Sequence, residues 1–211
     1  VRYVGDPIAM VIAETLDQAK SAAELIEIKF KQLPSVTNTA NTVETGSPPV
    51  WEECSDNISN LFEAGDARKT EMVFQSADTI VKRRFVISRV YAQYIEPRGA
   101  LGDYNERDGR FTLYADVQYP HRVRQLLAEK VFRIPEQDIR VVSADVGGGF
   151  GTKGWQYVEH RLVIWATKKI GRPVKWTCER CECVLADEHA RDNVTDAEIA
   201  LDLEGTFLAL R

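Results

Sequence analysis

The sequence predicts an α+β fold in which mixed sheets pack against helices. Three observations favour this class. Runs such as residues 79–91 alternate apolar and polar side chains, as strands do, whereas residues 15–26 and 120–133 place apolar side chains on one helical face. Residues 99–115 have the pattern of a β-hairpin, with a turn from Asn105 to Gly109. No internal repeat accompanies these elements.

The first part of the chain, residues 1–34, reads as a β-β-α-β unit. Two short β-like runs lie within residues 1–13 and are separated by a Gly-Asp-Pro turn. Thr15 is a suitable N-cap for a helix over residues 15–26, whose apolar residues share one face. Residues 26–33 alternate in the manner of a strand.

The second part, residues 67–211, follows a polar connection at residues 35–66 that is rich in Thr, Asn, Ser, Pro and Gly. A domain boundary is therefore expected in residues 35–66. The elements expected after it are a helix at 67–77, a strand at 79–91, the hairpin at 99–115, a helix at 120–133, a doubly buried strand at 139–146, a helix at 155–170 ended by Gly171, and strands at 173–180, 195–203 and 205–211.

Composition excludes several functional classes. The 211 residues carry a net charge of -5 and have a pI near 5.4, so neither nucleic acid nor an anionic membrane is an expected partner. No apolar run is long enough to span a membrane, and no signal peptide is visible, so a cytoplasmic location is expected. The chain opens and stops inside strand-like runs, which predicts a piece of a longer polypeptide.

Four cysteines raise the question of a metal site. Cys54 stands alone, and Cys178, Cys181 and Cys183 form a C-x-x-C-x-C run that we expect to be extended. No second pair of cysteines or histidines completes a four-ligand set, so reduced thiols are favoured over ligation.

The most informative stretch is glycine-rich and lies between a predicted strand and a predicted helix. Four of the five residues at 147–151 are glycine, and residues 149–154, GFGTKG, satisfy G-x-G-x-x-G. Glycines before a helix allow backbone N–H groups to approach phosphate oxygens, and Lys153 adds a positive charge. With Glu179 as a ribose-binding acid, the loop would bind a dinucleotide. Another phosphate-bearing or large polar cofactor and a purely structural turn remain open alternatives.

A family resemblance rests on longer stretches. The segment DVGGGFGTKG, preceded by ADVQYPHRVRQLLAEKV and IPEQDIRVV, resembles the molybdenum-binding subunit of the xanthine dehydrogenase, aldehyde oxidase and aerobic-type carbon monoxide dehydrogenase family. The resemblance covers nearly the whole chain, including YIEPRGALGDY and WTCERCECVLADEHARDNV. It implies that residues 1–34 end an a/b hammerhead domain, residues 35–66 are a linker, and residues 67–211 begin the molybdopterin-binding domain of a multidomain subunit.

The resemblance also implies a set of site residues. The side-chain amide of Gln118 would approach the apical oxygen of molybdenum, a contact for which a neutral donor is suited. The Phe-Gly pair would line the metal centre with its backbone, and the three preceding glycines would allow close approach. The expected cofactor-binding residues are Gln118, Gly147, Gly148, Gly149, Phe150 and Gly151. None would bind the metal directly.

The resemblance further implies a cofactor, partner subunits and a reaction. The cofactor would be molybdopterin in its cytosine dinucleotide form with Mo, and iron–sulfur and FAD subunits would be partners. The reaction would oxidise a small aldehyde, a heterocycle or carbon monoxide with water as the oxygen source. Gly154 replaces the glutamate of purine-oxidising members, which disfavours a purine substrate. The general base would lie beyond Arg211, so these 211 residues alone are expected to be inactive. A dinucleotide-dependent dehydrogenase and a non-catalytic assembly module are the alternatives.

Other polar residues are weaker candidates. His121 lies at the start of the expected helix and is more typical of a solvated or capping side chain than of a proton carrier. His160 and His189 are isolated histidines without a ligand pattern. Glu96 and Arg98, two residues apart, are expected to form a local ion pair with a structural role.

Overall fold

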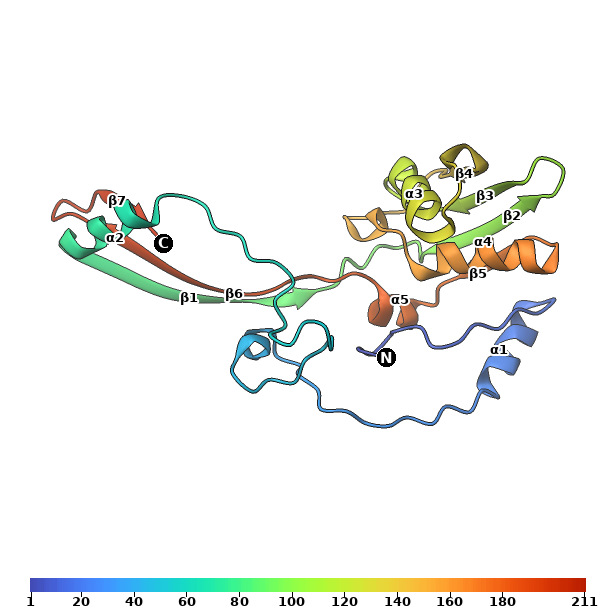
Figure 1. The fold of residues 1–211 in the computed structure, drawn as a ribbon, viewed down its shortest axis with the longest axis horizontal. Helices are drawn as coiled ribbons and strands as arrows, with labels where there is room; N and C mark the ends of the chain where they lie inside the picture. The colour runs from blue at the N-terminus through green and yellow to red at the C-terminus, as the bar shows by residue number, and fades with distance from the viewer. The chain divides into compact units, whose positions relative to one another are not determined.

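A computed structural model describes residues 1–211 and has the α+β architecture that the sequence predicts, with two sheets and five α-helices. The chain forms two compact units (Figure 1). One consists of residues 1–29 and 91–189, and the other of residues 30–90 and 190–211. None of the helices is both long enough and apolar enough to cross a membrane.

The first unit is built on a four-stranded mixed sheet in the order β4-β3-β2-β5. Strands β2 (Gly99–Asn105) and β3 (Arg110–Ala115) form the expected antiparallel hairpin. Strand β4 (Ile139–Val142) pairs parallel to β3, and β5 (Val174–Thr177) pairs antiparallel to β2. Only Ile139 of β4 is buried, so the prediction of a doubly buried strand is wrong, because β4 lies at the sheet edge.

Helix α4 (Val158–Ile170) lies along β2 and β5 and supplies much of the core (Figure 1). A Cβ on Gly102 would lie 2.7 Å from the carbonyl oxygen of Val163, so glycine lets the helix backbone rest directly on β2. The helix ends at Gly171, whose φ of +66° is the left-handed conformation typical of a C-terminal cap. Buried side chains of the sheet and helices complete this core, among them Leu113, Val123, Leu127, Val163 and Ile164.

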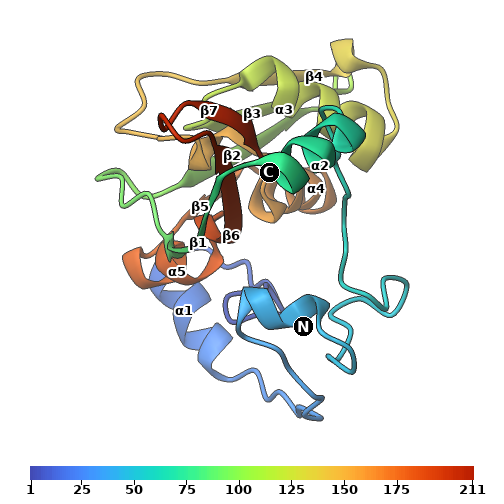
Figure 2. The same ribbon diagram turned by 90° about the vertical axis from the view of Figure 1, so that its left-hand side faces the viewer.

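Three further α-helices belong to the first unit. Helix α3 (Pro120–Leu126) begins at Pro120, as predicted, and continues as a π-helical turn, η2 (Leu127–Phe132). Helix α1 (Leu16–Glu24) is capped by Thr15, whose hydroxyl accepts a hydrogen bond from the Gln18 backbone at 3.2 Å. It lies beside the start of helix α5 (Arg180–Ala186), where Lys20 pairs with Glu179 (Figure 2).

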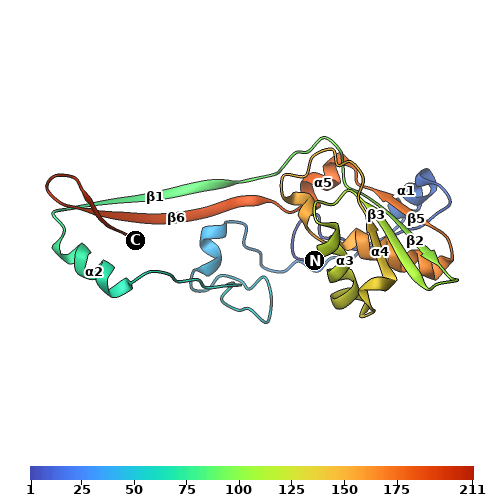
Figure 3. The same ribbon diagram turned by 90° about the horizontal axis from the view of Figure 1, so that it is seen from above.

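The second unit is an extended antiparallel ribbon with a short third strand. Strands β1 (Thr79–Val90) and β6 (Ala190–Leu201) pair along nearly their whole length, and β7 (Phe207–Leu210) turns back on β6 (Figure 3). Helix α2 (Ala67–Ser76) starts at the N-cap Asp66. The polar connection contains only a 3-10 turn, η1 (Thr39–Val43), and an isolated bridge.

Two predictions about local structure are wrong. Residues 1–13 and 26–33 contain no strand, because no neighbouring strand pairs with them, and their alternating apolar side chains remain exposed. The cysteine run is not extended. Cys181 and Cys183 lie in α5, because Glu179 and Glu182 make a reciprocal capping box that starts a helix at Arg180, and Cys178 lies between β5 and this helix.

Candidate functional site

The glycine-rich loop, residues 143–157, connects the edge strand β4 to helix α4. Its backbone reverses sharply, with φ values of +98° at Gly148, +49° at Phe150 and +93° at Gly151. Positive φ is readily adopted by glycine and costs a phenylalanine conformational energy, so Phe150 is held there by its surroundings. A short 3-10 turn, η4 (Thr152–Gly154), then leads toward the helix.

Gln118, which follows β3, is joined to this loop at two points. Its backbone N–H donates to the carbonyl oxygen of Lys153 at 2.9 Å, and its Oε1 accepts from the N–H of Gly151 at 2.9 Å. A Cβ on Gly149 would lie 2.6 Å from the same Oε1, so a larger residue there would have to move the Gln118 side chain. The structure therefore brings together Gln118, Gly149 and Gly151, although 33 residues separate the two hydrogen-bonded partners.

The hydrogen bond to Gly151 also decides which end of the Gln118 amide is free. A backbone N–H can only donate, so the atom facing it is the carbonyl oxygen. The amide nitrogen of Gln118 makes no hydrogen bond to the protein, and the side chain is partly exposed. The site thus presents a neutral N–H donor beside a backbone loop that is open because it lacks side chains at four positions.

Glu96 is a further residue of the loop site. Its Oε2 accepts hydrogen bonds from the N–H of Gly147 at 2.6 Å and from the Lys153 ammonium at 2.9 Å. The predicted ion pair of Glu96 with Arg98 is wrong, because Glu96 pairs with Lys153. Local sequence spacing could not have identified this pair, since 57 residues separate Glu96 from Lys153.

Lys153 lies inside the protein. Its side chain is 0% exposed and forms ion pairs with Glu96 and Asp116, and its ammonium lies 4.6 Å from the centre of the Tyr94 ring. Asp116 also accepts a hydrogen bond from the N–H of Gly99 at 2.8 Å. The charge of Lys153 is therefore neutralised internally and is not directed toward a phosphate in the loop.

The dinucleotide alternative meets a second difficulty at Glu179. A dinucleotide site places its ribose-binding acid on a strand next to the one that precedes the glycine loop. Here β4 and β5 are the opposite edges of the sheet, with β3 and β2 between them. Glu179 follows β5, caps α5 and pairs with Lys20.

A buried polar cluster supports the loop from the other side. Arg98 donates to Asp187 at 2.6 Å and to Glu159 at 3.0 Å, and its guanidinium lies 3.7 Å from the centre of the Tyr157 ring. The hydroxyl of Tyr157 donates to the carbonyl oxygen of Thr152 at 2.9 Å. Burial raises the pKa of Tyr157, so its hydroxyl stays protonated and remains a donor to the loop.

Three aromatic side chains near the loop are exposed. Phe150 is 76% exposed, Tyr119 is 54% exposed and Trp155 is 45% exposed. A Cβ on Gly154 would lie 3.1 Å from the Tyr119 ring, so a side chain at this position would have to move that ring. Large exposed apolar side chains beside a backbone cradle are typical of a surface that a ligand or another domain covers.

The histidines and cysteines lie apart from any metal-ligand arrangement. No group of three or more His, Cys, Asp or Glu side chains is positioned to hold a metal ion. Cys178 and Cys183 are buried beside Tyr94, and Cys181 is exposed. Burial, with smaller contributions from Arg98 and Arg161, lowers the pKa of His160 to about 3, so this side chain is neutral.

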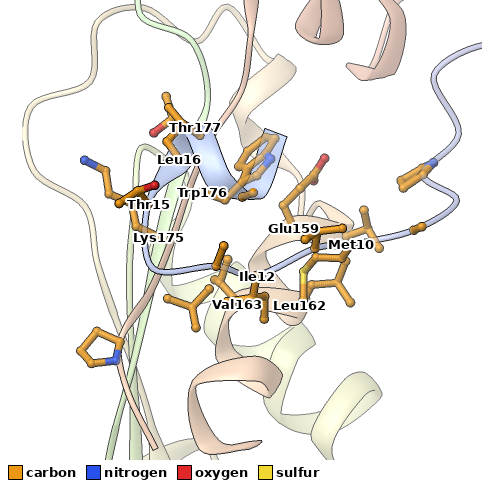
Figure 4. A pocket seen from close by; sticks show the side chains of 18 of the residues that line it. Met10, Ile12, Thr15, Leu16, Glu159, Leu162, Val163, Lys175, Trp176 and Thr177 are labelled. Carbon is orange, nitrogen blue, oxygen red and sulfur yellow. The ribbon is translucent and has the colours of Figure 1, made fainter. Parts of the chain in front are cut away.

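An apolar hollow of about 440 Å³ lies elsewhere in the first unit, where residues 7–19 pass over α4 and β5 (Figure 4). Met10, Ile12, Leu162 and Trp176 are among its lining side chains. None of the residues of the glycine loop or Gln118 lines it. The hollow is therefore separate from the loop site.

The fold is an α+β unit with a glycine-rich loop beside Gln118, and comparison with known proteins gives the family. The "Molybdopterin cofactor-binding domain" family matches residues 50–211. The chain belongs to this family, and the resemblance drawn from its sequence is confirmed.

Two individual relatives are the large subunits of enzymes. The chain is 32% identical over its whole length to the nicotine 6-hydroxylase large subunit of Paenarthrobacter nicotinovorans, and 30% identical to the carbon monoxide dehydrogenase large chain of Hydrogenophaga pseudoflava. It covers 26% and 28% of these two proteins, so it spans about a quarter of their length.

Solved structures agree with these relatives. A Cu,Mo carbon monoxide dehydrogenase superimposes with a TM-score of 0.85 over 93% of this chain and 26% of the other, at 28% identity. Quinoline 2-oxidoreductase from Pseudomonas putida 86 superimposes with a TM-score of 0.79 over 94% of this chain and 25% of the other, at 32% identity.

Proposed function

We propose that this chain is the part of a molybdenum hydroxylase subunit that cradles the molybdopterin cofactor. The observation that supports this most directly is the free amide donor of Gln118, held against the loop by the Gly151 N–H. Gln118 would donate a hydrogen bond to the bound cofactor without changing the net charge of the site.

The residues present fit the cofactor. Gly147, Gly148, Gly149 and Gly151 place no side chain over this part of the loop, and a Cβ at Gly149 would fill space beside Gln118. Phe150 and Gly151 turn the backbone toward Gln118. When bound, the cofactor would supply a redox-active molybdenum centre that takes electrons from a substrate carbon while water provides the oxygen.

The finer assignments belong to the same proposal. Residues 1–34 would end an a/b hammerhead domain, residues 35–66 would link it, and residues 67–211 would begin the cofactor domain. The cofactor would have the cytosine dinucleotide form, and iron–sulfur and FAD subunits in the cytoplasm would carry electrons away. The general base would lie outside these residues, so the 211 residues alone would be inactive.

The substrate would be a small aldehyde, a heterocycle or carbon monoxide. The relatives named above include enzymes of nicotine, carbon monoxide and quinoline, so both ring compounds and carbon monoxide occur among them. Gly154 provides no carboxylate, and the Tyr119 ring lies beside it, which argues against recognition of a purine at this position.

The complete subunit with its partners provides the test. The enzyme, purified from a host that makes molybdenum cofactors, is assayed with aldehydes, heterocycles and carbon monoxide, an artificial electron acceptor and ¹⁸O-labelled water. We expect one substrate class to be oxidised and its product to contain ¹⁸O. Absence of the label from the product of an active preparation would refute the proposal.

The same preparation distinguishes the alternatives. A dinucleotide-dependent dehydrogenase would bind NADH saturably in a fluorescence titration, and Glu179→Ala would weaken that binding. A non-catalytic assembly module would contain neither molybdenum nor NADH-binding capacity. We expect molybdenum and no saturable NADH signal from the residues described here.

A further inference from the structure

One carboxylate oxygen bonds to two points of the glycine loop, one at each side of its glycine run. Glu96 Oε2 accepts from the N–H of Gly147, at the start of the glycine run, and from the ammonium of Lys153, which follows it. The backbone N–H of Glu96 donates in return to the carbonyl oxygen of Gly147 at 3.3 Å. Glu96 is thus attached to the loop by its backbone and by its side chain.

The contact at Gly147 is too close for a side chain. A Cβ built on Gly147 would lie 2.5 Å from the Cβ of Glu96. The φ of Gly147 is not in the positive range, so close approach, not backbone conformation, is what requires glycine here. The loop backbone therefore rests directly against the segment that leads into β2.

Burial of Lys153 makes this arrangement difficult to open. An ammonium that is 0% exposed requires charged or hydrogen-bonding partners, and those of Lys153 are Glu96 and Asp116. Moving the loop away from Glu96 would remove one of the two carboxylates that neutralise Lys153. Burial alone would raise the pKa of Glu96, but hydrogen bonds from Lys153 and Gly147 outweigh it and keep the pKa below its ordinary value.

We propose that Glu96 and Lys153 are positioning residues that hold the glycine loop in the conformation that receives the cofactor. Lys153 acts through Glu96 and Asp116 and does not contact a cofactor phosphate. The identity of the cofactor rests on the function proposed above, whereas the restraint on the loop is a property of the protein without its cofactor. Loss of either residue should loosen the loop first and lower cofactor occupancy as a consequence.

The test uses the complete subunit with Glu96→Ala, Glu96→Gln and Lys153→Met. Glu96→Gln retains an oxygen that can accept from Gly147 but removes the charge that faces Lys153. Glu136→Gln is the matched control, since Glu136 pairs with Arg124 on the surface of the same unit, away from the loop. Cofactor-free protein from a cofactor-deficient host is examined by hydrogen exchange, and protein from a cofactor-competent host by molybdenum analysis.

We expect the peptide that covers residues 143–153 to exchange on the order of 10-fold faster in cofactor-free Glu96→Ala than in the wild type. Lys153→Met should have a similar effect, and Glu96→Gln a smaller one. Molybdenum content should fall in the same order. Glu136→Gln should match the wild type in both measurements. A general loss of stability would instead accelerate exchange throughout the unit, and Glu96→Gln would not partly restore the loop.

Three results would overturn the proposal. The first is unchanged loop exchange in both Glu96→Gln and Lys153→Met. These two variants also provide the test if Glu96→Ala does not fold. The second is loss of molybdenum in Lys153→Met without faster loop exchange, because Lys153 would then contact the cofactor directly. The third is acceleration that is uniform across the unit. A wild-type subunit without molybdenum would refute the proposed function alone, since loop exchange in cofactor-free protein would still test the restraint.

Discussion

At the scale of single residues, Gln118 is the side chain whose chemistry matters most for the proposed function. Its oxygen is engaged by Gly151, and its amide nitrogen is the neutral donor left to the site. We expect Gln118→Ala to keep the cofactor, because the loop backbone is intact, and to lower kcat about 100-fold, as loss of one positioned donor does. Steady-state kinetics of the complete enzyme is the measurement.

The control variant is Gln125→Ala, because Gln125 is an exposed residue of α3 whose side chain bonds to Glu129. An equal loss of kcat in both variants would contradict the role assigned to Gln118.

The buried His160 leads to a prediction about how the stability of the protein depends on pH. The folded protein holds His160 neutral because burial lowers its pKa to about 3, whereas an unfolded histidine has a pKa near 6.5. The unfolded state therefore takes up a proton first as the pH falls. The contribution of His160 to stability is complete above about pH 6.5 and declines by up to about 1.4 kcal/mol per pH unit toward pH 3.

The variant that isolates this effect is His160→Gln, which offers an acceptor to the Tyr157 N–H in place of the imidazole nitrogen that now lies 3.2 Å from it. We expect the urea midpoint of the complete subunit to decline less steeply between pH 6.5 and pH 4 in the variant than in the wild type. Parallel pH profiles would show that His160 is protonated in the folded state.

At the scale of elements, Arg98 joins three parts of the first unit. It precedes β2, pairs with Glu159 in α4 and pairs with Asp187 after α5. All three side chains are almost fully buried, so removal of the guanidinium leaves unpaired carboxylates inside the protein. We expect Arg98→Met to lower the local unfolding free energy of β2 and α5 by about 3 kcal/mol or more.

Hydrogen exchange of peptides from β2 and α5 measures this change. Arg124→Ala is the control, because the Arg124–Glu136 pair is more than a third exposed and should contribute less than about 1 kcal/mol. Similar exchange in both variants would mean that the buried cluster does not stabilise these elements.

Elements with local signals were the ones that the sequence predicted well. Thr15 with Gln18 at the start of α1, Pro120 at the start of α3, Gly171 at the end of α4 and the Asn105–Gly109 turn all encode their element within a few residues. The strands expected in residues 1–13 and 26–33 do not form, because a strand depends on a partner that its own residues do not specify.

The candidate site was likewise predicted only in part from the sequence. The glycine loop was visible as a pattern, and Gln118 was assigned to it only through the family resemblance. Glu96 was assigned to the wrong ion pair and Asp116 was not recognised, because their partner Lys153 is distant in the sequence and a lysine in such a loop is normally taken for a phosphate-binding residue. Only the structure reveals that this lysine is buried.

At the scale of the whole molecule, the chain belongs to a cofactor-binding domain family. It spans about a quarter of the length of its relatives. Within this chain, four of the five residues at 147–151 are glycine, and Glu96 and Gln118 bond to the loop that contains them. Gly149 is the glycine next to Gln118, since a Cβ there would lie 2.6 Å from its side chain. Gly99 is its counterpart in β2, where the nearest atom to a Cβ would be 3.9 Å away.

The most direct measurement is therefore the molybdenum content of the complete subunit and of its Gly149→Ala and Gly99→Ala variants, purified from a cofactor-competent host. We expect close to one molybdenum per wild-type and Gly99→Ala subunit, and a severalfold lower content in Gly149→Ala, because the added methyl group takes up space inside the cradle itself. A wild-type subunit without molybdenum, or equal contents in all three proteins, would contradict the proposal that this loop holds the cofactor.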